Sequence, residues 1–192
     1  MYVPHDIDGL AAKFGSDKAF ANLLDTLFTL ESKRGERGSI GQYWHGNEPG
    51  QQLPYLYNYV GQPWKTQKLV NRILNELYTT NPDGLAGNDD CGQISAWYIL
   101  SSMGFYPVAP GQTIYAIGSP LFPKATIHLE SGKTFTIQAK NRTPENCYIQ
   151  SALLNGNPYQ KSYLKHEDIV NGGELVFEMG PQPNQNWGTA KT

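Results

Sequence analysis

The sequence predicts part of an α+β multidomain protein, in which a helical part is followed by an antiparallel β part. Apolar residues recur at helical spacing up to about Pro107 and follow a strand pattern after it. Turn-forming segments such as 131–133 and 155–158 separate the later apolar runs. Because helices and strands are segregated along the chain, we expect two domains, residues 1–107 and residues 108–192.

The helical part contains three long apolar stripes and two shorter ones. The first stripe covers residues 20–28, with Ser16 as its expected N-cap, and the second covers residues 69–78 and ends at the turn 81–84. The third helix is expected from about Gly92 to Met103. Its apolar residues cover most of its circumference, which predicts burial on all sides and a helical assembly larger than this chain alone can form. Shorter helices are expected at 7–14 and 52–59.

The second part has the pattern of a β domain. Its apolar runs are short, bounded by turn residues, and rich in β-branched and aromatic side chains. The expected strands are 113–117, 125–129, 134–139, 148–154 and 175–179.

Composition excludes several functional classes. The 192 residues carry a net charge of −2 and no long basic cluster, so neither nucleic acid nor an anionic membrane is an expected partner. No apolar run approaches the roughly 18 residues needed to cross a bilayer, and residues 1–10 do not form a signal peptide. The two cysteines, Cys91 and Cys147, form no CxxC pair, so zinc is not expected. Their pairing with each other is left open.

Asp89 and Asp90 stand side by side where the third helix is expected to begin. Backbone donors and the positive end of the helix dipole would keep at least one carboxylate ionised, which suits a general base or a cation ligand. A structural interpretation competes with this one. Asp90 followed three residues later by Gln93 has the form of a capping box, in which Asp90 only closes the helix.

The loop at residues 44–54 gathers polar side chains between two helical segments. Carboxylate and amide oxygens with one formal charge suit calcium better than zinc. An ordinary polar loop would explain the same residues, and a hydrogen-bonded structural role would explain His45 beside Trp44. The candidate side chains are His45, Asn47, Glu48, Gln51 and Gln52.

Four segments, 2–10, 45–49, 54–67 and 87–108, resemble glycoside hydrolase family 92, the calcium-dependent inverting exo-α-mannosidases that often act on α-1,2-linked mannose. The resemblance continues through 117–122, 166–169 and 179–188, and so covers essentially the whole chain. Family members join an (α/α)6 barrel to β-sandwich material. The resemblance implies that this chain is a C-terminal fragment: the last part of that barrel followed by a C-terminal antiparallel β-sandwich segment.

The resemblance also assigns roles to the candidate residues. It implies that the paired aspartates carry the general base, with Asp90 preferred over Asp89. The implied Ca2+ ligand is Glu48, with Gln51 and Gln52 as candidate ligands. Many members have two histidines after the Asn-Glu-Pro-Ser motif where this chain has glutamines, which leaves the ligand roles at 51 and 52 open. The residues implied to bind substrate are Trp44, His45, Asn47 and Glu48.

The implied substrate is a mannose-containing oligosaccharide of the N-glycan or mannan type, and the implied location is extracytoplasmic in a bacterium. The family's general acid is expected upstream of residues 2–10, so the isolated chain should show little or no activity. Two other classes compete with the enzyme. One is a non-catalytic carbohydrate-binding module, and the other is an assembly fragment that self-associates through the incomplete barrel face.

Overall fold

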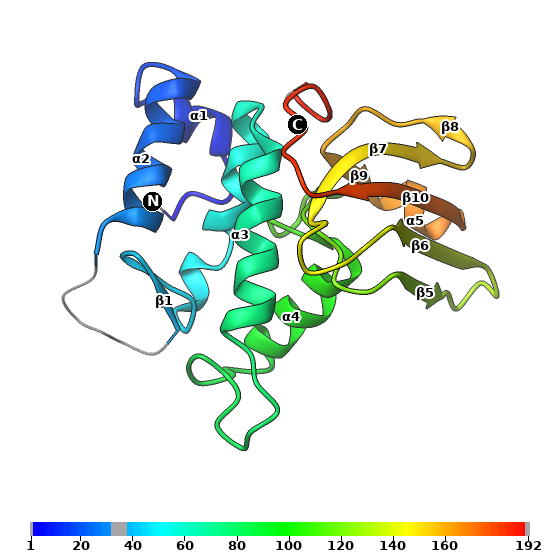
Figure 1. The fold of residues 1–192 in the computed structure, drawn as a ribbon, viewed down its shortest axis with the longest axis horizontal. Helices are drawn as coiled ribbons and strands as arrows, with labels where there is room; N and C mark the ends of the chain where they lie inside the picture. The colour runs from blue at the N-terminus through cyan, green and yellow to red at the C-terminus, as the bar shows by residue number, and fades with distance from the viewer. Residues whose placement is uncertain (1, 32–37, 191–192) are drawn as a thin grey trace.

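The computed structural model describes residues 2–31 and 38–190, and helices precede strands along the chain (Figure 1). The N-terminal part contains α1 (Ile7–Ala12), α2 (Asp17–Thr29), α3 (Pro63–Glu76) and α4 (Gln93–Met103), together with the 3-10 segments η1 (Glu48–Gly50) and η2 (Leu53–Val60). A small hairpin, β1 (Ser39–Ile40) and β2 (Tyr43–Trp44), precedes η1. The predicted helices are confirmed, with the segment at 52–59 in 3-10 rather than α form.

Local signals define the ends of these helices. The Ser16 hydroxyl accepts a hydrogen bond from the Ala19 backbone N–H at 3.1 Å, which confirms Ser16 as the N-cap of α2. Pro63 occupies the first turn of α3, where a missing N–H costs nothing. Gly104 ends α4 in the left-handed region, with φ 105°.

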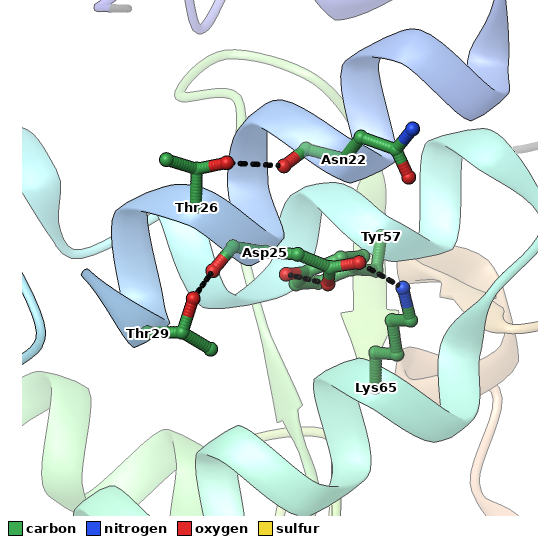
Figure 2. A network of polar contacts seen from close by, with 6 residues as sticks. All are labelled: Asn22, Asp25, Thr26, Thr29, Tyr57 and Lys65. Carbon is green, nitrogen blue, oxygen red and sulfur yellow. Dashed lines mark hydrogen bonds and ion pairs between the residues drawn. The ribbon is translucent and has the colours of Figure 1, made fainter.

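A carboxylate joins three elements of the helical part (Figure 2). Asp25 of α2 accepts from the Tyr57 hydroxyl of η2 at 2.9 Å and pairs with Lys65 of α3 at 2.6 Å. The Thr29 hydroxyl donates to the Asp25 backbone carbonyl, and the Thr26 hydroxyl donates to the Asn22 backbone carbonyl, so both hydroxyls form hydrogen bonds within α2. These contacts fix α2 against η2 and α3.

The C-terminal part forms two sheets. The first has the order β3–β4–β9, made of β3 (Phe105–Tyr106), β4 (Ile114–Ile117) and β9 (Tyr163–Lys165). The second has the order β5–β6–β10–β7–β8, made of β5 (Lys124–His128), β6 (Thr134–Lys140), β10 (Gly173–Gly180), β7 (Tyr148–Leu154) and β8 (Asn157–Pro158). The short helix α5 (His166–Val170) follows β9. Side chains from both sheets form one apolar cluster that includes Ile117, Phe177 and Trp187.

The expectation of a purely antiparallel β part is wrong at one pair of strands. β10 runs parallel to β6 and antiparallel to β7, so the larger sheet is mixed. The chain passes through β7, β8, β9 and α5 between β6 and β10, and a connection of that length permits parallel pairing. The apolar alternation that identifies a strand carries no information about the direction of its neighbour.

Buried polar side chains join the helical and β parts. The Asn58 side chain of η2 donates to the backbone carbonyls of Ile117 and Ser162 at 2.8 and 2.9 Å. Gln67 of α3 accepts the Ile149 backbone N–H of β7 at 3.0 Å. Helix α3 accordingly stands between the N-terminal helices and the larger sheet (Figure 1). The domain boundary at residue 107 stays a prediction.

Helix α4 is not buried on all sides within this chain. Ile94 and Trp97 are fully buried, whereas Ile99 is 59% exposed. Burial on all sides was predicted only for a larger assembly, and in this chain α4 presents Ile99 to solvent. Of the two cysteines, Cys91 is exposed and Cys147 is buried, and both are free thiols.

Candidate active site

A pocket of about 430 Å³ brings together residues from four separate segments of the chain. The start of the chain, the η1 loop, the entrance to α4 and the segment after β3 each contribute one side. Three of the predicted site residues, Glu48, Gln52 and Asp90, line it together. The complete lining is Tyr2, Pro4, Glu48, Pro49, Gln52, Asp90, Gln93, Tyr106, Pro107, Val108 and Pro110.

The two adjacent aspartates have different surroundings. The Asp89 carboxylate accepts the Ser95 backbone N–H at 2.9 Å and the Ser95 hydroxyl at 2.8 Å. The backbone and hydroxyl donors of Ser95 hold the pKa of Asp89 below its ordinary value. Asp90 is exposed and lines the pocket. The Asp89 carboxylate is therefore held by Ser95, whereas the Asp90 carboxylate is open to the pocket.

The predicted capping box at Asp90 is wrong. Helix α4 has Gly92 as its N-cap residue, and no side chain caps it there. The carboxylate that serves the first turn belongs to Asp89 and reaches Ser95, six residues on, instead of the usual three. This longer reach is possible because the intervening backbone folds into a tight left-handed turn.

Three consecutive residues of that turn have positive φ. The angles are 35° at Asp90, 60° at Cys91 and 85° at Gly92. Only the glycine adopts this region without steric cost, so the turn stores strain at two residues. Such strain persists where the surrounding structure holds it, and it occurs often at functional sites. Here the Gln93 N–H donates to the Asp89 carbonyl at 2.7 Å and closes the turn beneath Asp90.

The η1 loop supplies the other polar side of the pocket. Glu48 is half-buried at the start of η1, and Pro49 follows it. Gln52 is only 6% exposed, yet no described residue forms a hydrogen bond with its carboxamide, which lines the pocket. The Gln52 carboxamide is therefore open to the space of the pocket.

Gln51 was a candidate metal ligand, but it does not line the pocket and lies behind its wall. Its amide nitrogen donates to the His45 backbone carbonyl at 3.1 Å, and its amide oxygen accepts from Gln93 at 3.2 Å. The Trp97 indole donates to its backbone carbonyl at 3.0 Å. Both ends of this fully buried side chain are occupied by protein groups.

His45 is also buried away from the pocket. Its Nδ1 lies 2.7 Å from the Tyr43 hydroxyl, and its Nε2 lies 2.6 Å from the Tyr78 hydroxyl. Burial lowers the pKa of His45 to about 3, so the ring is neutral at ordinary pH. The structural interpretation of His45 is the one observed. Trp44 and Asn47 are exposed, and neither lines the pocket.

Gln93 and Tyr106 are pocket residues that the sequence did not reveal as such. The Gln93 amide nitrogen donates to the Tyr106 hydroxyl oxygen at 2.9 Å. Gln93 appeared in the sequence only as the partner of a capping box. The sequence feature that could have indicated Tyr106 is its position shortly after α4, because the chain that leaves this helix can pass close to the pocket again.

The donor set suits a hard cation. Glu48 and Asp90 supply carboxylate oxygens to the pocket, and Gln52 supplies an amide oxygen without a protein partner. Calcium accepts this mixture of charged and neutral oxygens. Across residues 2–31 and 38–190, no group of three or more His, Cys, Asp or Glu side chains could hold a metal ion.

Carboxylates lining one pocket are the groups that glycoside hydrolases use for acid–base chemistry. Comparison with known proteins agrees with this class. Residues 1–181 match the sequence profile of the glycosyl hydrolase family 92 catalytic domain. The chain therefore belongs to glycoside hydrolase family 92.

Solved structures of family 92 mannosidases from Bacteroides thetaiotaomicron superimpose closely. One α-mannosidase is 44% identical, with a TM-score of 0.93, over 98% of this chain and 26% of its own. A family 92 inverting mannosidase is 42% identical, with a TM-score of 0.88, over 97% of this chain and 27% of its own. The first enzyme has also been solved in complex with mannoimidazole.

A curated relative from the fungus Arthroderma benhamiae, described as an uncharacterized secreted glycosidase, is 33% identical over the whole chain. The chain spans about a quarter of the length of each of these relatives. Within the part of the chain that the structure describes, no helix has both the length and the apolar character to cross a membrane.

Proposed function

We propose that this chain forms part of the active site of a calcium-dependent, inverting α-mannosidase that removes terminal α-1,2-linked mannose. One observation supports this most strongly: the pocket brings together the side chains of Asp90, Glu48 and Gln52. These groups are the base and the cation ligands that such a reaction requires. The mannosidase names of the similar structures support the substrate class.

In an inverting reaction, one displacement by water breaks the glycosidic bond while a general acid protonates the leaving oxygen. We propose that Asp90 is the base that removes a proton from this water. Asp89 has both carboxylate oxygens on Ser95, so it holds the turn that presents Asp90. The general acid would come from the part of a longer enzyme that this chain does not include.

Glu48 and Gln52 would hold the calcium ion, and Asp90 lines the same pocket. The chemistry that bound calcium supplies is coordination of the sugar's 2- and 3-hydroxyls, which favours a distorted ring. The side chains themselves orient the sugar. Gln51 would support these residues indirectly, because its side chain bonds the His45 carbonyl and Gln93 behind the pocket wall.

The proposed setting of the enzyme is extracytoplasmic, acting on N-glycan or mannan oligosaccharides. The secreted description of the fungal relative supports export, and the Bacteroides structures support a bacterial source. The carbohydrate-binding module is the weaker alternative, because the pocket lies largely on the helical part and not on the sheets.

The reaction is tested by proton NMR of α-1,2-mannobiose during hydrolysis, in this chain and in the longer enzyme that would contain it. We expect β-mannose as the first product, and little turnover from the chain alone because the acid is missing. Asp90→Asn should slow the longer enzyme by about 10²- to 10⁴-fold. α-Mannose as the first product, or full activity of Asp90→Asn, would refute the proposal.

A further inference from the structure

The orientation of the side-chain amides behind the pocket can be deduced from their contact with a backbone carbonyl. The His45 carbonyl can only accept, so the Gln51 group that faces it at 3.1 Å must be the amide nitrogen. The Gln51 oxygen then points the other way, toward Gln93 at 3.2 Å. The Trp97 indole N–H also donates to the Gln51 backbone carbonyl at 3.0 Å.

The orientation of Gln93 follows from that of Gln51. The Gln51 amide oxygen can only accept a hydrogen bond, so the group of Gln93 that faces it is the amide nitrogen. The same nitrogen donates its second hydrogen to the Tyr106 hydroxyl oxygen at 2.9 Å. Both hydrogens of the Gln93 amide are thereby used, and no described residue donates to its Oε1.

Tyr106 is left with an unused proton at the pocket. Its oxygen accepts from Gln93, and no described residue accepts its O–H. The ring stacks on Tyr55, with 5.4 Å between ring centroids, and packs beside Trp97, so the hydroxyl has a fixed position. Tyr106 is 8% exposed and lines the pocket together with Gln93.

We propose that the Tyr106 O–H and the Gln93 Oε1 form a donor–acceptor pair that binds one hydroxyl group of the sugar, with Gln51 as the positioning residue that sets the polarity of the pair. A sugar hydroxyl both accepts and donates, so one group can accept from Tyr106 and donate to Gln93. This inference rests on the proposed sugar-binding function and names specificity residues within it.

The test is a double-mutant cycle with methyl α-mannopyranoside and its 2-, 3-, 4- and 6-deoxy derivatives, titrated into the chain with calcium present. In the unchanged chain each deoxy sugar loses the contacts of one hydroxyl. Tyr106→Phe should weaken methyl α-mannopyranoside about three- to tenfold. In this variant, removing the sugar hydroxyl that Tyr106 binds should cause no further loss of affinity, because the Tyr106 O–H is already absent. Tyr115→Phe, which removes the hydroxyl of a half-buried tyrosine on β4 that bonds His166 and does not line the pocket, should change nothing.

The outcomes separate this inference from the proposed function. If the unchanged chain binds none of the sugars, the sugar-binding function and the inference both fail. If it binds them, but Tyr106→Phe weakens all of them equally or none at all, only the inference fails. Gln51→Met should reduce the same hydroxyl-specific coupling, and full coupling in that variant would refute the positioning role of Gln51.

Discussion

At the scale of single residues, neighbouring aspartates divide two tasks. Asp89 is held by Ser95 and caps the first turn of α4, while Asp90 lines the pocket in a left-handed conformation. Sequence spacing could not separate them, because both precede the same helix. The contact that separates them spans six residues and depends on the left-handed turn between.

The Asp89 carboxylate should stabilise the chain only where it is ionised. Its folded-state pKa is lowered by the Ser95 donors, so its contribution is present above the ordinary aspartate pKa and lost as pH falls through the folded value. Asp89→Asn should therefore lower the free energy of unfolding at pH 7, and the deficit should shrink at acid pH. Urea unfolding across pH measures this, and a deficit that does not change with pH would contradict it.

The strain at Cys91 should be measurable as stability. Its φ of 60° costs a non-glycine residue about 1 kcal/mol. Cys91→Gly should therefore raise the free energy of unfolding by about 1 kcal/mol, partly offset by the added freedom of the unfolded chain. Cys91→Ala is the matched control, since it keeps a β-carbon and the strain. Equal stability of the two variants would show that the turn is not strained.

At the scale of elements, helices were predicted well because their signals are local. The Ser16 cap marks a helix start that the structure confirms, whereas α3 begins at Pro63, six residues before the predicted apolar stripe. Strands of two or three residues, such as β1, β8 and β9, are too short for a recognisable alternation. The parallel pairing of β6 with β10 depends on partners far apart in sequence.

Asn58 is the clearest link between elements, because its amide joins η2 to two carbonyls of the β part. Asn58→Ala would leave both carbonyls buried without this donor and should cost about 2–4 kcal/mol of unfolding free energy. Asn75→Ala, an exposed asparagine on α3, should stay within about 0.5 kcal/mol of the unchanged chain. Similar losses in both variants would argue against Asn58 as a link.

At the scale of the whole molecule, the open side of α4 is the main unexplained surface. A groove beside it is lined by the apolar and aromatic side chains of Tyr78, Leu85, Tyr98 and Ile99 and by the hydroxyl side chains of Thr79, Thr80 and Ser95. Matched relatives are about four times longer, so other parts of a longer enzyme would have room to cover it. We propose that in the isolated chain this surface promotes self-association.

Ile99→Glu should reduce that association, because a charge in place of an exposed apolar side chain opposes burial. Light scattering against protein concentration should show a lower apparent mass for this variant. Phe122→Glu, at another exposed apolar residue, is the matched control and should associate as the unchanged chain does. Equal behaviour of the two variants would exclude the α4 surface as the contact.

We propose that the pocket lined by Glu48, Gln52 and Asp90 binds calcium as part of a mannosidase site. The most direct test of this claim is calorimetric titration of calcium into the chelator-treated chain, beside Glu48→Gln, Gln52→Leu and the surface control Glu130→Gln. We predict saturable binding by the unchanged chain and by the control, with binding lost in the two pocket variants. Absence of binding by the unchanged chain, or binding that survives in both pocket variants, would contradict the claim.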